Sequence, residues 1–233
     1  MQRSHISEQY DIELSHLRNR LMEMGGLVEQ QVNQACTSLV SHDLRMAEDV
    51  RDAEARLNQM EVDLDDECVG IIAKRQPTAG DLRAVVSVMK LISDLERLGD
   101  EADRVAKMAI SLIDFETPPD QYAGFRSMHQ QVMRQLNRAL DAFARLDVEA
   151  ALRVIEDDND IDRAYNELVR ACIQGMRSTP EEAEHLVSVM WATRALERIG
   201  DHCKNISEYV IYQVKGTDVR HTGDPEDELL DES

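Results

Sequence analysis

Aromatic residues are scarce in this sequence, since only 4% of its 233 residues are Phe, Trp or Tyr. A core that lacks aromatic side chains has to be filled by Leu, Met, Ile, Val and Ala. That composition suits helices better than sheets, and the charged fraction of 31% suits the solvent-facing sides of helices. The low aromatic content therefore favours an all-α fold.

Long apolar runs are missing as well. The sequence has no stretch of about 18 consecutive apolar residues, so we expect no transmembrane helix and no direct membrane insertion. The N-terminal residues MQRSHISEQYDIEL lack the apolar core of a signal peptide. The four cysteines are scattered singly, which is typical of reduced thiols rather than of a structural zinc site. These absences predict a cytoplasmic protein.

A basic stripe, which a nucleic-acid-binding protein would need, is not apparent. The 46 acidic and 26 basic residues give a net charge of −20, which argues against nucleic acid and anionic lipid as partners. The same charge is compatible with bound cations, with a basic protein partner, or with solubility alone.

Helical periodicity dominates what is present. The segment DFETPPDQ, with Pro118 and Pro119, must interrupt any helix. Asp43, Thr78 and Thr179 are the expected N-caps. Short connections make neighbouring helices antiparallel. We predict six long helices, over residues 4–40, 43–75, 79–114, 123–145, 148–177 and 180–215.

The two halves of the chain match each other. DLERLGD at residues 94–100 returns as ALERIGD at residues 195–201, and VSVM occurs at matching positions before each heptapeptide. Further back, Leu57 matches Ile161. We therefore predict two tandem three-helix bundles, internally duplicated: residues 1–115, a linker over 116–122, a second bundle over 123–217, and an acidic tail over 218–233.

The repeated heptapeptide places two carboxylates on one side of a helix. Glu96 and Asp100 are one turn apart at the border of the apolar side, and so are Glu197 and Asp201. Like charges at this spacing destabilise a helix by about 0.2–0.5 kcal/mol, which suggests a compensating cation. A divalent metal with oxygen ligands, Mg²⁺, Mn²⁺ or Fe rather than Zn²⁺, is one candidate.

Two other interpretations stay open at this point. Arg97 and Arg198 lie about 100° further round the helix and could pair with acids of a neighbouring helix. The carboxylates could also form an acidic, solvated edge with ordinary salt bridges. His202 points away from the carboxylates, so we do not expect it to be a ligand.

Gly99 and Gly200 are unexpected inside helices, where glycine costs about 1 kcal/mol relative to alanine. Both lie on the apolar side, so the expected reason is close approach of a neighbouring helix. Such an approach would bring further acids towards the carboxylates, and the candidate pairs are Glu61 with Asp65 and Asp158 with Asp162. The other interpretation, which we favour for both pairs, is that they lie on the surface outside the site.

A second candidate site lies in the segment AKRQPTAGDLR at residues 73–83. Lys74, Arg75 and Arg83 gather positive charge there, on an otherwise acidic chain. The loop could bind a phosphate or carboxylate. The alternative is a helix–loop–helix junction that stabilises the fold.

With these motifs in view, the chain resembles the PhoU family of phosphate-specific transport accessory proteins over residues 4–221. The resemblance rests on the ordered segments MGGLVEQQV, IIAKRQPTAGDLR, DLERLGD, ALERIGD and ISEYVIYQVKGTDVRH. It implies two three-helix bundles, metal bound at E/DxxxD motifs and frequent homodimers. It also implies a regulator that represses the phosphate-starvation response by linking the ATPase subunit of a phosphate ABC transporter to a membrane sensor histidine kinase.

Carried onto this chain, the implied metal ligands are Glu96 with Asp100 and Glu197 with Asp201. Asp94 and Asp103 extend the first motif. Ala195 and Lys204 replace them in the second, so the two sites should differ.

The expected function is therefore non-enzymatic. The sequence has no Gly-rich phosphate loop, no nucleophile elbow, no HExxH and no Glu-x-x-His of a di-iron oxidase. Two rivals remain: a metal-dependent enzyme on a helical bundle, and a metal-free scaffold in which Arg97 and Arg198 satisfy the acids.

Overall fold

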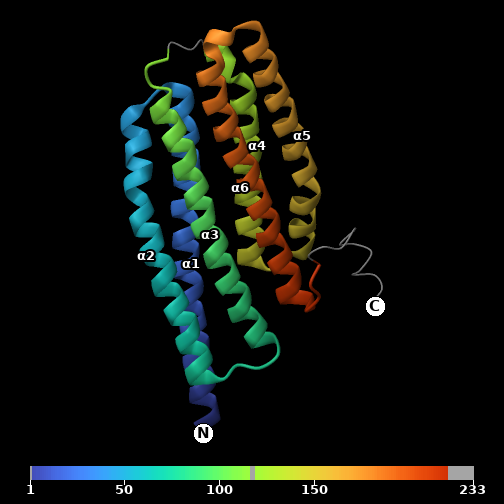
Figure 1. Cartoon of the computed structure of the whole chain (residues 1–233). Helices are drawn as coiled ribbons and strands as arrows, with labels where there is room; N and C mark the ends of the chain where they lie inside the picture. The colour runs from blue at the N-terminus through green and yellow to red at the C-terminus, as the bar shows by residue number, and fades with distance from the viewer. Residues whose placement is uncertain (1, 116–118, 220–233) are drawn as a thin grey trace.

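Helices make up almost all of the computed structural model, which describes residues 2–115 and 119–219 (Figure 1). No strand occurs among these residues, and the predicted all-α fold with six long helices is confirmed. Two 3₁₀ turns, η1 (Pro119–Tyr122) and η2 (Pro180–Glu182), precede α4 and α6. The long helices are α1 (Gln2–Ser41), α2 (Leu44–Arg75), α3 (Gly80–Ser111), α4 (Ala123–Arg145), α5 (Val148–Ser178) and α6 (Ala183–Lys215).

The two halves begin their second helices in the same way. The Asp43 carboxylate accepts a hydrogen bond from the backbone N–H of Met46 at 3.0 Å, which confirms the predicted cap. Asp147 caps α5 in the same manner, through the N–H of Ala150 at 2.9 Å. The prediction for Thr78 is wrong, because Ala79 holds the N-cap position of α3 without a side-chain hydrogen bond.

Two further helix ends differ slightly from the prediction. Thr179 precedes the short 3₁₀ turn η2, and its side chain makes no capping hydrogen bond. Helix α3 ends at Ser111, and the chain continues in turns to Phe115. Most of the predicted linker and acidic tail, residues 116–118 and 220–233, lies outside the described residues. Val219, which the prediction placed in the tail, is buried.

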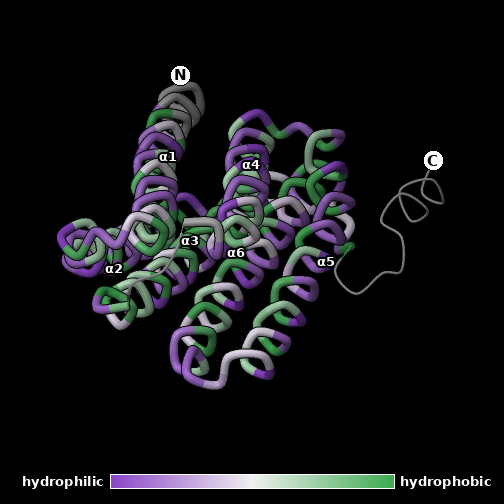
Figure 2. Tube along the Cα trace, turned by 90° about the horizontal axis from the view of Figure 1, so that it is seen from above, coloured by the Kyte–Doolittle hydropathy of each residue, from purple (hydrophilic) through white to green (hydrophobic). Residues whose placement is uncertain are grey.

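The two three-helix bundles share one hydrophobic core. Helices α1–α3 form the first bundle and α4–α6 form the second, and α3 packs lengthwise against α6 while α1 contacts α4. Figure 1 shows that α3 and α6 are antiparallel. In the view along the helices, they lie side by side in the middle of the molecule, with α2 and α5 at its two sides (Figure 2). The bundles are therefore joined along their length as well as by the chain.

Each motif glycine admits a side chain of a neighbouring helix. A Cβ on Gly99 would overlap Cδ2 of Leu57 on α2. A Cβ on Gly200 would lie 3.3 Å from the side chain of Ile161 on α5 and 3.2 Å from Oε1 of Gln135 on α4. The prediction that these glycines allow close helix packing is confirmed, and this packing brings α2 against the first motif and α5 against the second.

Candidate metal centre

The first motif faces acids of α2. Glu96 and Asp100 are half-buried on α3. Burial raises the pKa of Glu96, the charges of Asp100 and Glu61 raise it further, and Arg97 opposes them. The pKa of Glu61 is raised by burial and by the charges of Asp65 and Asp100. Negative charge thus gathers at the α2–α3 edge, and a cation bound there would relieve the repulsion among these carboxylates.

The second motif faces acids of α5. Glu197 is buried on α6, with 8% of its surface exposed, and Asp201 is exposed one turn later. Burial raises the pKa of Glu197 to about 7, and Asp201 adds to the shift while Arg194 opposes it. The charges of Asp162 and Asp158 raise it further. This α5–α6 edge repeats the arrangement of the α2–α3 edge.

Asp158 differs from its neighbours because it is both buried and partly neutralised. Burial raises its pKa, whereas a hydrogen bond from Gln135 at 3.3 Å and the charge of Lys204 lower it. The Lys204 ammonium lies 3.7 Å from the Asp158 carboxylate. The second edge therefore already contains a cation of the protein, Lys204, at the position that Asp103 holds in the first repeat.

All but one of the acids on neighbouring helices that act on the motif glutamates were candidates from the sequence. Glu61 of α2 acts on Glu96, and both members of the α5 pair act on Glu197, whereas Asp65 acts on Glu61. Glu54, whose charge also raises the pKa of Glu96, was not predicted. Glu54 occupies the position in α2 that Asp158 occupies in α5, and that match was the available signal. Within residues 2–115 and 119–219, no three or more Cys, His, Asp or Glu side chains are arranged to hold a metal ion. The metal sites at the two edges thus stay a prediction.

Asp94 does not join the first motif. It is buried between α3 and α6, where it accepts hydrogen bonds from the hydroxyl of Tyr209 at 2.6 Å and from Nδ2 of Asn205 at 3.3 Å. Nδ1 of His202 lies 2.6 Å from the same carboxylate. The structure thus gives Asp94 a role in joining the two bundles, and it gives His202 a carboxylate partner.

Asp103, the other additional acid, is buried and paired with basic residues. Its carboxylate contacts Nε of Arg51 on α2 at 3.1 Å and the ammonium of Lys107. The structure therefore places Asp103 in an ion pair between α2 and α3, two turns along α3 from Glu96.

The arginines of the two motifs have different surroundings. Arg198 pairs across the bundles with Glu101 of α3 at 3.2 Å, as expected for an acid on a neighbouring helix. Arg97 is exposed, and its charge lowers the pKa of Glu96. The arginine that contacts a motif carboxylate is Arg194, whose Nη1 donates to Glu197 at 2.6 Å. The sequence analysis missed Arg194, although it lies three residues before Glu197 on the same helix.

The basic residues of the α2–α3 loop do not converge. Arg75 donates two hydrogen bonds to the Glu13 carboxylate of α1, at 3.0 and 2.7 Å. The guanidinium of Arg83 packs against Gly216 at the C-terminal end of α6, and Lys74 is exposed. This arrangement favours the interpretation of a fold-stabilising junction over an anion site.

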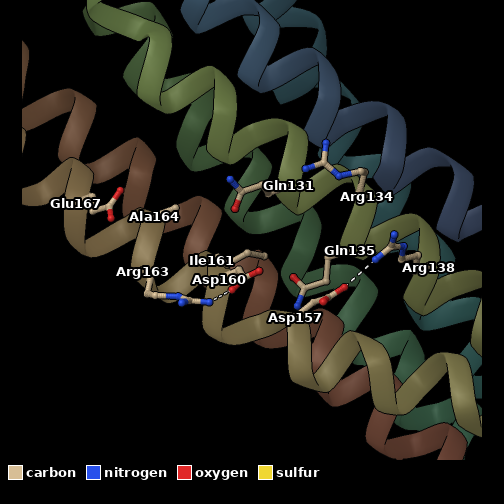
Figure 3. A pocket seen from close by; sticks show the side chains of 10 residues that line it. All are labelled: Gln131, Arg134, Gln135, Arg138, Asp157, Asp160, Ile161, Arg163, Ala164 and Glu167. Carbon is tan, nitrogen blue, oxygen red and sulfur yellow. Dashed lines mark hydrogen bonds and ion pairs between the residues drawn. The ribbon is translucent and has the colours of Figure 1, made fainter.

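A polar groove of about 580 Å³ lies between α4 and α5 (Figure 3). Arg138 donates to Asp157 at 2.7 Å across the groove, and Arg163 pairs with Asp160 on α5. The basic and acidic side chains of its lining are thus largely paired with each other. The groove also lies apart from Glu197 and Asp201 of α6, because only α4 and α5 line it.

Comparison with known proteins identifies the fold and the motifs. A family model described as the PhoU domain matches residues 21–109 and 125–210, one stretch in each bundle. The chain belongs to the PhoU family. It is 48% identical over 219 residues to a PhoU homolog of Pseudomonas putida, covering 94% of this chain and 86% of the relative. It is 40% identical over 227 residues to PhoU of Escherichia coli K12, covering 97% and 94% of the two chains.

Crystal structures of PhoU proteins have the same architecture. The structure from Pseudomonas aeruginosa matches with a TM-score of 0.86 at 45% identity, covering 89% of this chain and all (100%) of that one. The structure from Streptococcus pneumoniae, named a phosphate transport system regulatory protein, matches with a TM-score of 0.83 at 28% identity, covering 90% and 99%. No helix in residues 2–115 and 119–219 is long and apolar enough to cross a bilayer.

Proposed function

We propose that this PhoU-family chain is a non-enzymatic, cytoplasmic regulator of phosphate uptake that represses the phosphate-starvation response. The observation that carries the proposal is the family match in both bundles, to relatives named phosphate-specific transport system accessory proteins. The proposed partners are the ATPase subunit of a phosphate ABC transporter and a membrane sensor histidine kinase, and the proposed working form is a homodimer.

We propose further that each acidic edge holds a divalent metal, Mg²⁺, Mn²⁺ or Fe. The edges supply oxygen ligands, which these ions prefer. The raised pKa values of Glu96 and Glu197 support the proposal, because carboxylates held close together gain most from a bound cation. The metals would fix α3 against α2 and α6 against α5, and so fix the surface that a partner meets.

The test of the regulatory role is complementation. A bacterial strain that lacks its own PhoU-family protein would carry this chain and a reporter of the phosphate-starvation response. Wild type should restore repression at high phosphate, and the Glu96→Gln/Glu197→Gln variant should not. The matched control is Asp141→Asn/Glu149→Gln, which neutralises two exposed carboxylates on α4 and α5. Failure of the wild-type chain to repress would refute the proposed function.

The test of the metal sites is elemental analysis of protein purified without chelator. Metal should be present in the wild-type protein and lost from the Glu96→Gln/Glu197→Gln variant. The Asp94→Asn variant should keep its metal, because the Asp94 side chain is directed at α6. A folded wild-type protein without metal that still represses would favour a second candidate, the metal-free scaffold. The contact between Arg194 and Glu197 favours that candidate at the second edge. Turnover of a phosphoester by metal-loaded protein, lost in Glu96→Gln, would favour an enzyme instead.

A further inference from the structure

A stripe of basic residues runs along the junction of α3 and α6, which we call the α3–α6 seam. The stripe consists of Arg83, Lys90, Arg97 and Arg104, each seven residues after the last on α3. Residues seven apart lie on nearly the same side of a helix, with a drift of about 20° per step. This stripe was not predicted, because its cations are separated in the sequence and gather only on the helix.

Contacts with α6, direct or through a shared carboxylate, place three of these four residues at the seam. Arg97 is placed there by its seven-residue spacing along α3. Arg83 packs against Gly216, and Nζ of Lys90 lies 4.9 Å from the ring centroid of Tyr212. Further along, Nη1 of Arg104 donates to Glu101 at 2.9 Å, and Arg198 of α6 contacts the same carboxylate at 3.2 Å. The stripe thus follows the seam from one end of α3 to its second half.

Around Glu101 the groups that the seam presents to solvent are positively charged. The side chains of Arg104 and Arg198 are 52% and 40% exposed, whereas the Glu101 side chain between them is 4% exposed. Asp94, the other acid of the seam, is buried and satisfied by α6. The two arginine side chains therefore lie closer to solvent than the carboxylate with which they pair, on a chain whose net charge is −20.

Helix α6 adds an aromatic anchor to the seam. Trp191 lies seven residues before Arg198, on the same side of α6, and is 64% exposed. It is the only tryptophan in the chain. Exposed Trp and Arg side chains are the residues most enriched among those that dominate binding energy in protein interfaces. The exposed Glu184, seven residues before Trp191, bounds the basic surface at that end.

We propose that the α3–α6 seam docks an acidic helix of a partner protein, with carboxylates at seven-residue intervals. Cations seven residues apart on a helix are separated by about 10.5 Å, the spacing that a facing helix repeats every heptad. Two antiparallel helices also form a groove that a third helix can enter at ordinary packing distances. The net charge disfavours nucleic acid, because its continuous phosphate charge would be repelled by the rest of the molecule.

This inference deepens the proposed function, on which it rests, because it names where a partner of the regulator would bind. The partner is defined by its chemistry: a helix with glutamate or aspartate once per heptad and an apolar residue to cover Trp191. Arginine can serve such a carboxylate while it keeps its contact with Glu101, since a guanidinium has five N–H donors.

The experiment uses the full chain and a designed 28-residue helical peptide without tryptophan, with a glutamate at every seventh position. Trp191 emission reports binding directly, and isothermal titration calorimetry gives the affinity. A second peptide of identical composition, with the glutamates spread around the helix, tests spacing against net charge. We expect the heptad peptide to bind, with an affinity at least tenfold higher than that of the second peptide. No binding, or equal binding of the two peptides, overturns the proposal.

Two double variants locate the site. Arg97→Ala/Arg104→Ala should weaken binding of the heptad peptide at least tenfold. Arg145→Ala/Arg153→Ala removes two exposed arginines of α4 and α5 that pair within their own helices, and it should leave the affinity unchanged. If both double variants lose affinity for the heptad peptide equally while their helix content is unchanged, the binding site is not at the seam. If the heptad peptide does not bind while the wild-type chain still represses the phosphate-starvation response in cells, the seam proposal is wrong and the proposed function stands.

Discussion

At the scale of single residues, both motif glycines make room for a side chain of a neighbouring helix, and the contact is closer at Gly99 than at Gly200. Leu57 is 1% exposed, so it has no free space into which to move away from a Cβ at Gly99. We expect Gly99→Ala to lower the free energy of unfolding by about 2 kcal/mol, since overpacking typically costs 1–3 kcal/mol. A Cβ at Gly200 would lie 3.2 Å from Oε1 of Gln135 and 3.3 Å from Ile161, so these side chains need shift only slightly. Because that small cost is offset by about 1 kcal/mol of helix propensity, the effect of Gly200→Ala should be near zero.

Urea denaturation of the two variants checks this difference. In a double-mutant cycle with Leu57→Ala, the shorter side chain should remove the overlap, so the double variant should be more stable than the sum of the single effects. A Gly99→Ala protein as stable as wild type would contradict the packing argument.

The raised pKa of Glu197 predicts a pH-dependent stability in metal-free protein. The unfolded chain releases this proton near the ordinary pKa of 4.5, and the folded protein holds it to about 7. The folded state binds more protons in that window, so this residue makes stability fall as the pH rises from about 4.5 to 7. Glu197→Gln removes the effect, which is worth up to about 3 kcal/mol.

The measurement is denaturation at pH 5 and pH 7 with a chelator present. The stability of Glu197→Gln relative to wild type should increase between these pH values, whereas that of the exposed-site control Glu149→Gln should stay constant. Taking each variant against wild type cancels the opposite contribution of His129 and His185, whose pKa values burial lowers. A constant difference for Glu197→Gln would contradict the prediction.

At the scale of the helices, the end of α2 offers a stabilising substitution. Gln76 is exposed and adopts a left-handed conformation, with φ 48° and ψ 56°, directly before Pro77. Non-glycine residues lose about 1 kcal/mol there, which glycine avoids. We expect Gln76→Gly to raise the free energy of unfolding by about 0.5 kcal/mol and the control Gln59→Gly, within α2, to lower it by about 1 kcal/mol. Thermal denaturation of the two variants measures the difference. A lower stability of Gln76→Gly, like that of Gln59→Gly, would contradict the prediction.

Most helix boundaries could be predicted because their signals are local. An aspartate cap such as Asp43 and a proline such as Pro77, two residues after the end of α2, act within a turn of themselves. The start of α3 was predicted to within one residue, but its cap was not, because Ala79 adopts φ 48° and ψ −117° without any side-chain cap, and neither its residue type nor its neighbours specify that conformation.

The paired carboxylates of the candidate site could also be predicted, because their spacing along one helix is a local signal. The pair Glu197 and Asp201 follows from helical spacing alone, and so does Glu96 with Asp100. The contribution of Asp158 depends on the register of α5 against α6, and the orientation of Asp94 depends on which side of α3 meets α6. Those relations depend on how different helices pack against each other, which the spacing along one helix does not determine.

At the scale of the whole molecule, the shared core predicts that both bundles unfold together. A buried carboxylate, Asp94, links them by accepting from Tyr209 and Asn205 and contacting His202. Because α3 and α6 bury apolar surface against each other along their length, neither bundle keeps its core when the other unfolds. Far-UV circular dichroism reports all helices and Trp191 emission reports α6, so we expect the two signals to give coincident urea transitions.

Removal of Asp94 tests how far that link matters. Asp94→Ala removes the carboxylate that contacts the buried Tyr209 and the half-buried Asn205 and His202, so we expect a loss of about 2–4 kcal/mol. Asp94→Asn keeps one acceptor oxygen in the same place and should lose less than half as much. If Asp94→Ala were as stable as wild type, the α3–α6 hydrogen bonds would contribute nothing net. If the two signals separated in wild type, the bundles would be independent folding units, and the shared core would not couple them.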